Sequence, residues 1–99
     1  MRPQIEISPL DYEQVLEWED AKLYCFSLTV DDKTGWRLPT LADLIDIYTR
    51  SDIDCSPERY WASDIMDEDF YWTFDFDTRI PEAYGFKAKL YVRPVRDIT

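Results

Sequence analysis

The chain contains no histidine, and this absence excludes several familiar kinds of active site. Histidine is the commonest general base of enzymes and a leading metal ligand. A Ser-His-Asp triad or a Cys-His pair therefore cannot form within this chain. No glycine-rich phosphate loop is present, and the many carboxylates single out no pair for acid–base catalysis. We therefore expect a protein that is not an enzyme, with no catalytic residue and no cofactor.

Cysteine and glycine are scarce, with two residues of each. In a reducing cytosol Cys25 and Cys55 would be free thiols, with Cys25 a small core residue. In a secreted chain the two could form one bridge. Zinc held by two cysteines and carboxylates has little support from the spacing, so we predict no metal site. The low glycine content and the lack of a low-complexity run argue against disorder.

Long apolar runs are also missing, since no stretch approaches the roughly 20 residues that span a bilayer. Residues 1–6 lack the apolar centre of a secretory signal. We therefore predict a cytoplasmic protein that makes no membrane contact. A length of 99 residues fits a single domain, residues 1–99, and an aromatic content of 16% supplies material for its core.

Positive charge is in short supply, because 11 basic residues face 21 acidic ones and the net charge is −10. Between Asp52 and Asp77 there are nine carboxylates and one cation, Arg59. Direct contact with nucleic acid needs clustered Lys and Arg, so it is disfavoured. The surplus favours a basic protein partner, although an acidic surface can also serve solubility alone.

The most informative segment is residues 35–40, which read Gly35-Trp36-Arg37-Leu38-Pro39-Thr40. Gly35 permits backbone conformations closed to other residues, and Pro39 pushes Leu38 into an extended conformation. Thr40 can cap a helix, with Asp43 in place of the usual Glu of a capping box. The segment predicts a rigid corner that leads into a helix.

Two helices are predicted from apolar spacing. Trp18, Ala21, Cys25 and Leu28 recur at helical intervals, which predicts a helix over about 17–29. A second helix is expected over about 41–50, with one apolar face formed by Leu41, Leu44, Ile45 and Tyr48.

The remaining elements are predicted to be strands. Residues 4–8 alternate apolar and polar, and residues 60–63 form a short aromatic run. In 71–77, Trp72, Phe74 and Phe76 share one face and Thr73, Asp75 and Asp77 the other, which predicts one face in water. A last strand is expected over 87–93, interrupted by Pro94. Residues 65–70 and 79–85 are expected to be loops. This order predicts an α+β fold with an antiparallel sheet.

Six motifs occur in one order along the chain. They are Trp18-x-x-Ala21 with Cys25, the segment 35–40, Asp43-Leu44, Tyr60-Trp61-Ala62-Ser63, Trp72-Thr73-Phe74 and Tyr91-Val92-Arg93-Pro94-Val95-Arg96. Together they resemble the bacterial and phage "WRLPT" family of C-type-lectin-like domains, found at the C-terminus of Lcl-type adhesins. They are more distantly similar to the formylglycine-generating enzyme superfamily. The match covers roughly residues 14–96.

The resemblance implies two helices packed on a twisted antiparallel sheet, with the N- and C-terminal strands close together. It implies little about activity, because this fold hosts many binding functions. The chain departs from calcium-dependent lectins, since it has no asparagine and lacks their Glu-Pro-Asn and Trp-Asn-Asp motifs. Cys25 and Cys55 do not match the cysteine positions of the formylglycine enzymes, so that activity is not transferred.

Several aromatic residues have two interpretations. Trp36 with Arg37, or Tyr60 with Trp61, could form a platform for a ligand. The stronger interpretation places Trp36, Leu38, Tyr60 and Trp61 in the core and pairs Arg37 with a carboxylate at a structural corner.

The predicted binding site lies in the acidic segment. Residues 64–70 combine four carboxylates with three apolar side chains, and Met66 and Phe70 could anchor a partner while the carboxylates steer toward Lys and Arg. A solvated loop is nearly as well supported, and a calcium site much less so, because the EF-hand spacing is absent. The predicted partner-binding residues are Asp64, Met66, Asp67, Glu68, Asp69, Phe70, Asp75 and Asp77.

From these features we predict a non-catalytic binding module that engages a basic protein, in one version an inhibitor that mimics nucleic acid and occupies a nucleic-acid-binding groove. The alternative is a saccharide-binding domain that needs no calcium, which requires exposed aromatics beside carboxylates. The oligomeric state stays open, including an accessory subunit completed by oligomerisation.

Overall fold

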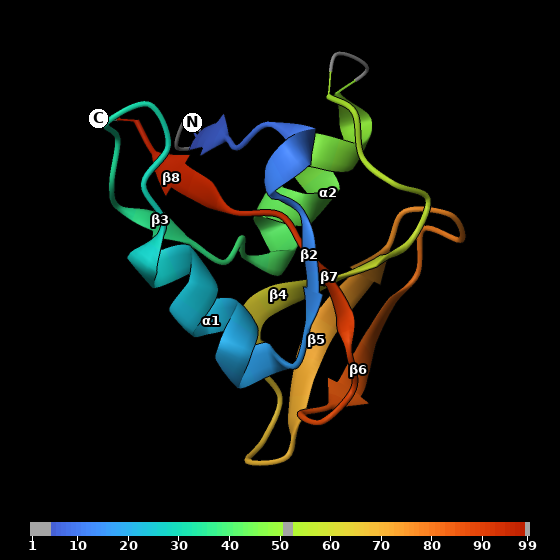
Figure 1. The fold of residues 1–99 in the computed structure, drawn as a ribbon. Coiled ribbons are helices and arrows are strands. Elements are labelled where there is room, and N and C mark those ends of the chain that lie inside the picture. The colour runs from blue at the N-terminus through green and yellow to red at the C-terminus, as the bar shows by residue number, and fades with distance from the viewer. Residues whose placement is uncertain (1–4, 51–52, 99) are drawn as a thin grey trace.

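The computed structural model describes residues 5–50 and 53–98, and within them the chain forms two α-helices and eight strands (Figure 1). Gln4, at the start of the first predicted strand, and Asp52 lie outside the described residues. In chain order the elements are β1 (Ile5–Ile7), the 3-10 helix η1 (Leu10–Tyr12), β2 (Gln14–Leu16), α1 (Trp18–Ser27), β3 (Trp36–Arg37), α2 (Leu41–Thr49), β4 (Arg59–Ile65), β5 (Phe70–Asp75), β6 (Pro81–Gly85), β7 (Leu90–Val92) and β8 (Val95–Asp97).

The strands form two sheets, and the fold is α+β as predicted. A three-stranded sheet has the order β1-β8-β3, and a five-stranded sheet has the order β2-β7-β4-β5-β6. The first sheet is antiparallel throughout. The second is mixed, because β4 and β7 run parallel where Tyr60 pairs with Tyr91. The expectation of purely antiparallel pairing was therefore wrong at this one junction.

Pro94 separates two strands that belong to different sheets. β7 ends at Val92, Arg93 and Pro94 leave the ladder, and β8 continues in the three-stranded sheet (Figure 1). Proline lacks the N–H that a ladder needs, so the predicted interruption is confirmed. β8 pairs with β1 in the register Ile5 to Asp97, which brings the first and last strands together.

α2 begins with the predicted capping box. The Thr40 hydroxyl accepts a hydrogen bond from the Asp43 N–H at 3.0 Å, and the Asp43 carboxylate accepts one from the Thr40 N–H at 2.9 Å. The predicted apolar face needs correction, because Leu44 and Ile47 are buried while Ile45 and Tyr48 are exposed. Ile47 turns inward because α2 also packs on the three-stranded sheet, where it joins a cluster with Ile5 and Val95.

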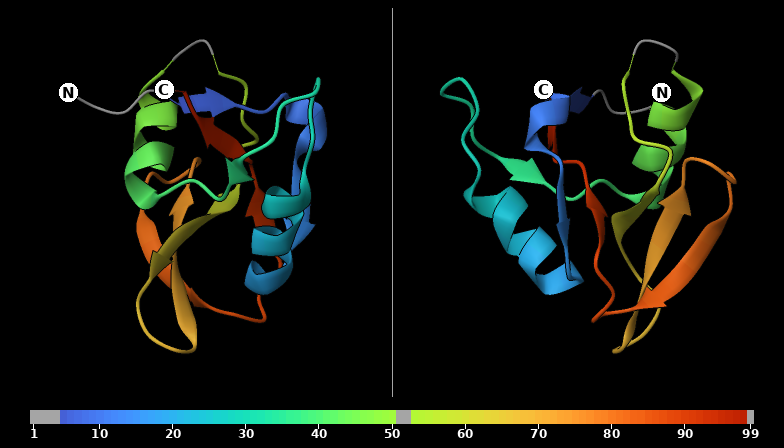
Figure 2. Two further views of the ribbon diagram at one scale, coloured as in Figure 1. Left: turned by 90° about the vertical axis from the view of Figure 1, so that its left-hand side faces the viewer. Right: turned by 45° about the vertical axis from the view of Figure 1, so that its right-hand side comes forward.

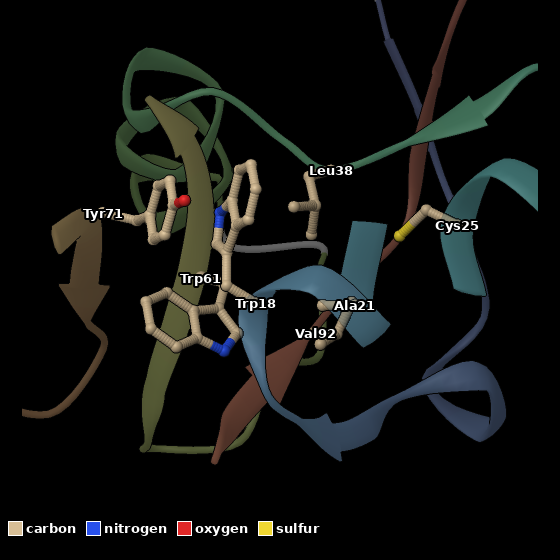
Figure 3. Packing of buried hydrophobic residues seen from close by; sticks show 7 residues of the cluster. All are labelled: Trp18, Ala21, Cys25, Leu38, Trp61, Tyr71 and Val92. Atoms are coloured by element: carbon tan, nitrogen blue, oxygen red, sulfur yellow. The ribbon is translucent and has the colours of Figure 1, made fainter. Parts of the chain in front are cut away.

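α1 buries the predicted stripe of Trp18, Ala21 and Cys25 against the five-stranded sheet (Figure 3). The Trp18 ring stacks on the Tyr71 ring with centroids 3.8 Å apart, and its Nε1 donates a hydrogen bond to the Ala62 carbonyl at 2.9 Å. α1 is thus fixed to β4 and β5 through one indole, beside the buried side chains of Leu38, Trp61 and Val92.

The prediction that β5 has one face in water was wrong. Phe74 is buried on the predicted apolar face, but Tyr71 and Thr73 are buried on the other. Trp18 of α1 covers Tyr71, and the Thr73 hydroxyl donates to the Glu82 carbonyl at 2.7 Å while accepting from Arg59. Burial of a threonine costs little when protein groups replace the hydrogen bonds that its hydroxyl made to water.

Four strands were absent from the prediction, namely β2, β3, β6 and β8. β6 occupies most of the expected loop 79–85 and pairs with β5, from Phe70–Gly85 to Phe74–Pro81. Its proline stands at the first position of an edge strand, where the missing N–H is tolerated. β2 is a second edge strand, and it pairs only with β7.

A buried polar cluster joins η1, the loop before β4 and the crossing between β7 and β8. Arg93 donates to the Glu13 carboxylate at 3.0 Å, to the Ser8 carbonyl at 2.7 Å and to the Asp54 carbonyl at 2.5 Å. The Tyr60 hydroxyl donates to the same Glu13 carboxylate. The side chains of Arg93 and Glu13 are 5% and 9% exposed, so this ion pair lies almost out of water.

Replacing Arg93 with Met should lower the free energy of unfolding by about 3–5 kcal/mol, because it leaves the buried Glu13 carboxylate without its cation. Arg79→Met is the matched control, since Arg79 is exposed, and it should change stability by less than about 0.5 kcal/mol. Denaturant unfolding of both variants checks this, and equal stabilities would contradict it.

Candidate functional site

The segment of residues 64–70, which we call the hairpin tip, joins β4 to β5 and protrudes beyond α1 (Figure 2). Its backbone is closed by hydrogen bonds from the N–H groups of Met66 and Asp67 to the Phe70 carbonyl, at 3.0 and 3.2 Å. The Asp67 carboxylate accepts from the N–H groups of Asp69 and Phe70 at 2.9 and 3.1 Å. The predicted loop is therefore a defined turn.

The hairpin tip combines apolar and acidic side chains in water. Ile65 is 63% exposed and Met66 57%, and Phe70 is exposed beside them. No Lys or Arg occurs in the sequence between Arg59 and Arg79. The surface of the tip is therefore both apolar and negatively charged.

The carboxylates of the hairpin tip divide into two groups. Asp64 accepts a hydrogen bond from the Leu41 N–H at 2.9 Å, so it supports the start of α2, and Asp67 holds the turn. The carboxylates of Glu68 and Asp69 are exposed and make no hydrogen bond or ion pair within residues 5–50 and 53–98. These two are free to meet a partner.

Asp75 and Asp77 lie away from the hairpin tip, at the other end of β5. A six-residue strand rises about 3.3 Å per residue, so the two ends are about 17 Å apart. The Asp75 carboxylate pairs with Arg59 at 3.2 Å and accepts from the N–H groups of Asp77 and Thr78. The structure does not bring these two residues together with residues 64–70.

The pKa of Asp75 reflects a structural role of this residue. Burial by itself would raise the pKa of Asp75, but the N–H groups of Asp77 and Thr78 and the charge of Arg59 outweigh that effect and lower it. Asp75 therefore stabilises the fold as a carboxylate.

Asp75→Asn should lower the free energy of unfolding at pH 7 by about 1–2 kcal/mol, because it removes charge-assisted hydrogen bonds. The lowered pKa means that the wild type holds this advantage above about pH 4, the ordinary value of Asp, and loses it as the pH falls through the folded-state pKa. Denaturant unfolding at several pH values tests this. Asp77→Asn is the control, and an equal effect of both variants would contradict the assignment.

The aromatic residues with two interpretations lie in the core. Trp36, Tyr60 and Trp61 are buried. Arg37 forms the predicted structural corner, with ion pairs to Asp43 at 2.9 Å and Asp97 at 2.8 Å. Tyr60 and Trp61 cannot stack on a ligand in this conformation.

A groove beside α1 was missing from the sequence prediction. This cavity of about 540 Å³, which we call the α1 groove, is lined by Trp18, Glu19, Lys22, Leu23, Phe26, Trp36, Arg37, Leu38, Thr40, Ser63 and Ile65. It lies between α1, the corner before α2 and the end of β4. Its sequence signal is the placement of Leu23 and Phe26 off the buried stripe of α1, where a polar residue would be ordinary.

Neither cysteine is activated as a nucleophile. Cys25 and Cys55 are free thiols, and burial raises their pKa to about 12 and about 11. Burial, followed by the hydrogen bond to Glu13, also raises the pKa of Tyr60. Within the described residues, no group of three or more His, Cys, Asp or Glu side chains could hold a metal ion.

The comparisons with known proteins do not assign the chain to a family. No protein-family model matches the chain, and no curated protein matches it. Neither helix of the described chain is long and apolar enough to cross a membrane.

Both thiols should resist alkylation by iodoacetamide at pH 8 in the folded protein. A pKa of about 11 leaves Cys55 with about 100-fold less thiolate than an ordinary cysteine, and Cys25 is fully buried as well. Mass spectrometry of timed samples tests this, with the protein unfolded in guanidinium as the reference. Rapid labelling of either thiol in the folded state would contradict the structure.

Proposed function

We propose that this protein is a non-catalytic binding module whose hairpin tip engages a basic surface of a partner protein. One observation carries the proposal: the hairpin tip protrudes from the fold (Figure 2), and it presents exposed apolar side chains beside two carboxylates that have no partner within the described residues. Apolar anchors that become buried supply most of the affinity of an interface, and charges around them set the partner and the association rate.

The proposed interface is smaller than the predicted one. It consists of Ile65, Met66 and Phe70 as anchors with Glu68 and Asp69 as the free charges. Asp64 and Asp67 belong to its framework, because each carboxylate already accepts backbone hydrogen bonds. Asp75 and Asp77 are left out, because they lie at the other end of β5.

The class of partner that we propose is a basic protein, including proteins that themselves bind nucleic acid. A net charge of −10 on 99 residues favours encounter with a positively charged surface. A protein that occupies such a surface would compete with nucleic acid and act as an inhibitor. The free thiols are consistent with work in a reducing cytoplasm.

The family resemblance is part of the proposal. Two helices packed on twisted sheets and the pairing of β1 with β8 are what a C-type-lectin-like fold of the "WRLPT" type requires. Saccharide binding, the alternative, loses the platform expected at Tyr60 and Trp61, because both rings are buried.

Charge reversal at the hairpin tip tests the proposed function. The immobilised protein captures its partner from lysate of the source cells, and the purified pair is then measured by calorimetry. Glu68→Lys with Asp69→Lys should weaken binding about tenfold or more, because both free carboxylates of the tip become cations. The matched control is Asp11→Lys with Glu82→Lys, which alters the net charge equally at exposed sites elsewhere.

The salt dependence and a competitor complete the test. Affinity should fall as the salt rises from about 50 to 500 mM, since exposed charges are screened. Duplex DNA that displaces the module would identify a nucleic-acid-binding surface on the partner. Equal affinity for the two double variants, or binding that ignores ionic strength, would contradict the proposal.

A further inference from the structure

The outer face of α1 is unusually apolar for a helix in water. Glu19, Lys22, Leu23 and Phe26 follow one another at the spacing of a single helix face, away from the buried stripe. Leu23 is 64% exposed and Phe26 is 82% exposed. A contiguous exposed apolar patch on a small protein marks an interaction site more often than it marks ordinary surface.

The α1 groove continues this face toward the hairpin tip. Leu23 and Phe26 line one side, Ile65 lines another, and Trp36 and Leu38 contribute from the corner before α2. Ile65 also belongs to the hairpin tip, so one apolar surface extends from α1 across the groove to the tip. A volume of about 540 Å³ lies within the range of preformed binding sites.

The charges around the groove favour a basic occupant. Arg37 is already neutralised by Asp43 and Asp97, whereas Lys22 keeps its charge over the Trp18 ring at 5.4 Å. Glu19 on the groove, and Glu68 and Asp69 on the adjoining tip, are exposed carboxylates, and these three outnumber Lys22. A second copy of this chain would bring two surfaces of net negative charge together, and a small ligand inside the groove would leave Phe26 in water.

The elements that line the groove favour a helical occupant over an extended one. β4 pairs with β5 on one side and with β7 only at Tyr60. Beside the groove the Ser63 N–H donates to the Pro39 carbonyl at 2.8 Å and the Ala62 carbonyl accepts from Trp18 at 2.9 Å, so these groups are not open to another strand. β3 spans only two residues. Side chains therefore form the contact surface, and a helix presents apolar side chains to such a groove at regular intervals.

We propose that the α1 groove binds a basic amphipathic helix of the partner protein. Apolar side chains of that helix enter the groove between Phe26 and Ile65, and its Lys and Arg side chains meet Glu19 and the free carboxylates of the hairpin tip. This inference rests on the proposed function, because it names the segment of the basic partner that the surface recognises.

A synthetic peptide of 18 residues, composed of Leu and Lys with all Leu on one helix face, is the probe. Trp18 and Trp36 line the groove, so binding should change the tryptophan fluorescence, and calorimetry gives the affinity. A peptide of the same composition with Leu distributed around the helix should bind about tenfold more weakly or worse. Phe26→Ser and Leu23→Ser should each cause a loss of similar size.

The matched control variant is Val15→Ser, an exposed apolar residue of β2 outside the groove, which should bind the peptide like the wild type. Circular dichroism confirms that each variant is folded. Equal affinity of the two peptides, or binding that Phe26→Ser and Leu23→Ser together leave unchanged, would overturn the groove assignment. A dimer in light scattering that Phe26→Ser dissociates would also overturn it, in favour of a second copy.

The two proposals fail separately with the captured partner. In one outcome, charge reversal at Glu68 and Asp69 abolishes binding and Phe26→Ser has no effect. This outcome supports the proposed function and contradicts the groove as a binding site. Loss with Phe26→Ser alone overturns the hairpin tip as the interface and, with it, the contact between the helix and the tip carboxylates.

Discussion

The ion pair between Glu13 and Arg93 is the constraint on which the arrangement of the two sheets depends. Arg93 lies at the point where the chain leaves one sheet and enters the other, and its guanidinium bonds to backbone carbonyls of Ser8 and Asp54. A buried charge requires a partner and saturated hydrogen bonds. Glu13 pairs with Arg93, and the Glu13 carboxylate also accepts a hydrogen bond from the Tyr60 hydroxyl. Any rearrangement that separated the sheets would leave this charge unpaired in the interior.

Because the interior is fixed in this way, the apolar residues at the surface are not exposed through loose packing of the core. Trp18 is locked by its stacking on Tyr71 and by its hydrogen bond to Ala62, so α1 has a single placement on the sheet. Leu23 and Phe26 remain outside because the inner face of α1 is already filled. A rigid body that holds apolar side chains in water loses little conformational entropy when a partner covers them, and this favours binding.

The sequence predicted the parts of the fold that local chemistry decides. The corner at residues 35–40, the capping box of Thr40 and Asp43 and the break at Pro94 all follow from backbone preferences of single residues. It did not predict β2, β3, β6 and β8, or the burial of Thr73, because these depend on neighbours distant in the chain. The hairpin tip was recognisable from its mixture of apolar and acidic residues. The α1 groove was not, since its walls come from three separate segments.

Hydrogen–deuterium exchange of the isolated protein and of its complex with the partner tests whether a preformed scaffold binds through one continuous surface, made of the hairpin tip and the outer face of α1. We expect new protection in the hairpin tip and in α1, with exchange in the loop 29–35 and the turn 76–80 unchanged. Protection confined to those last two segments, with none in α1 or the hairpin tip, would contradict it.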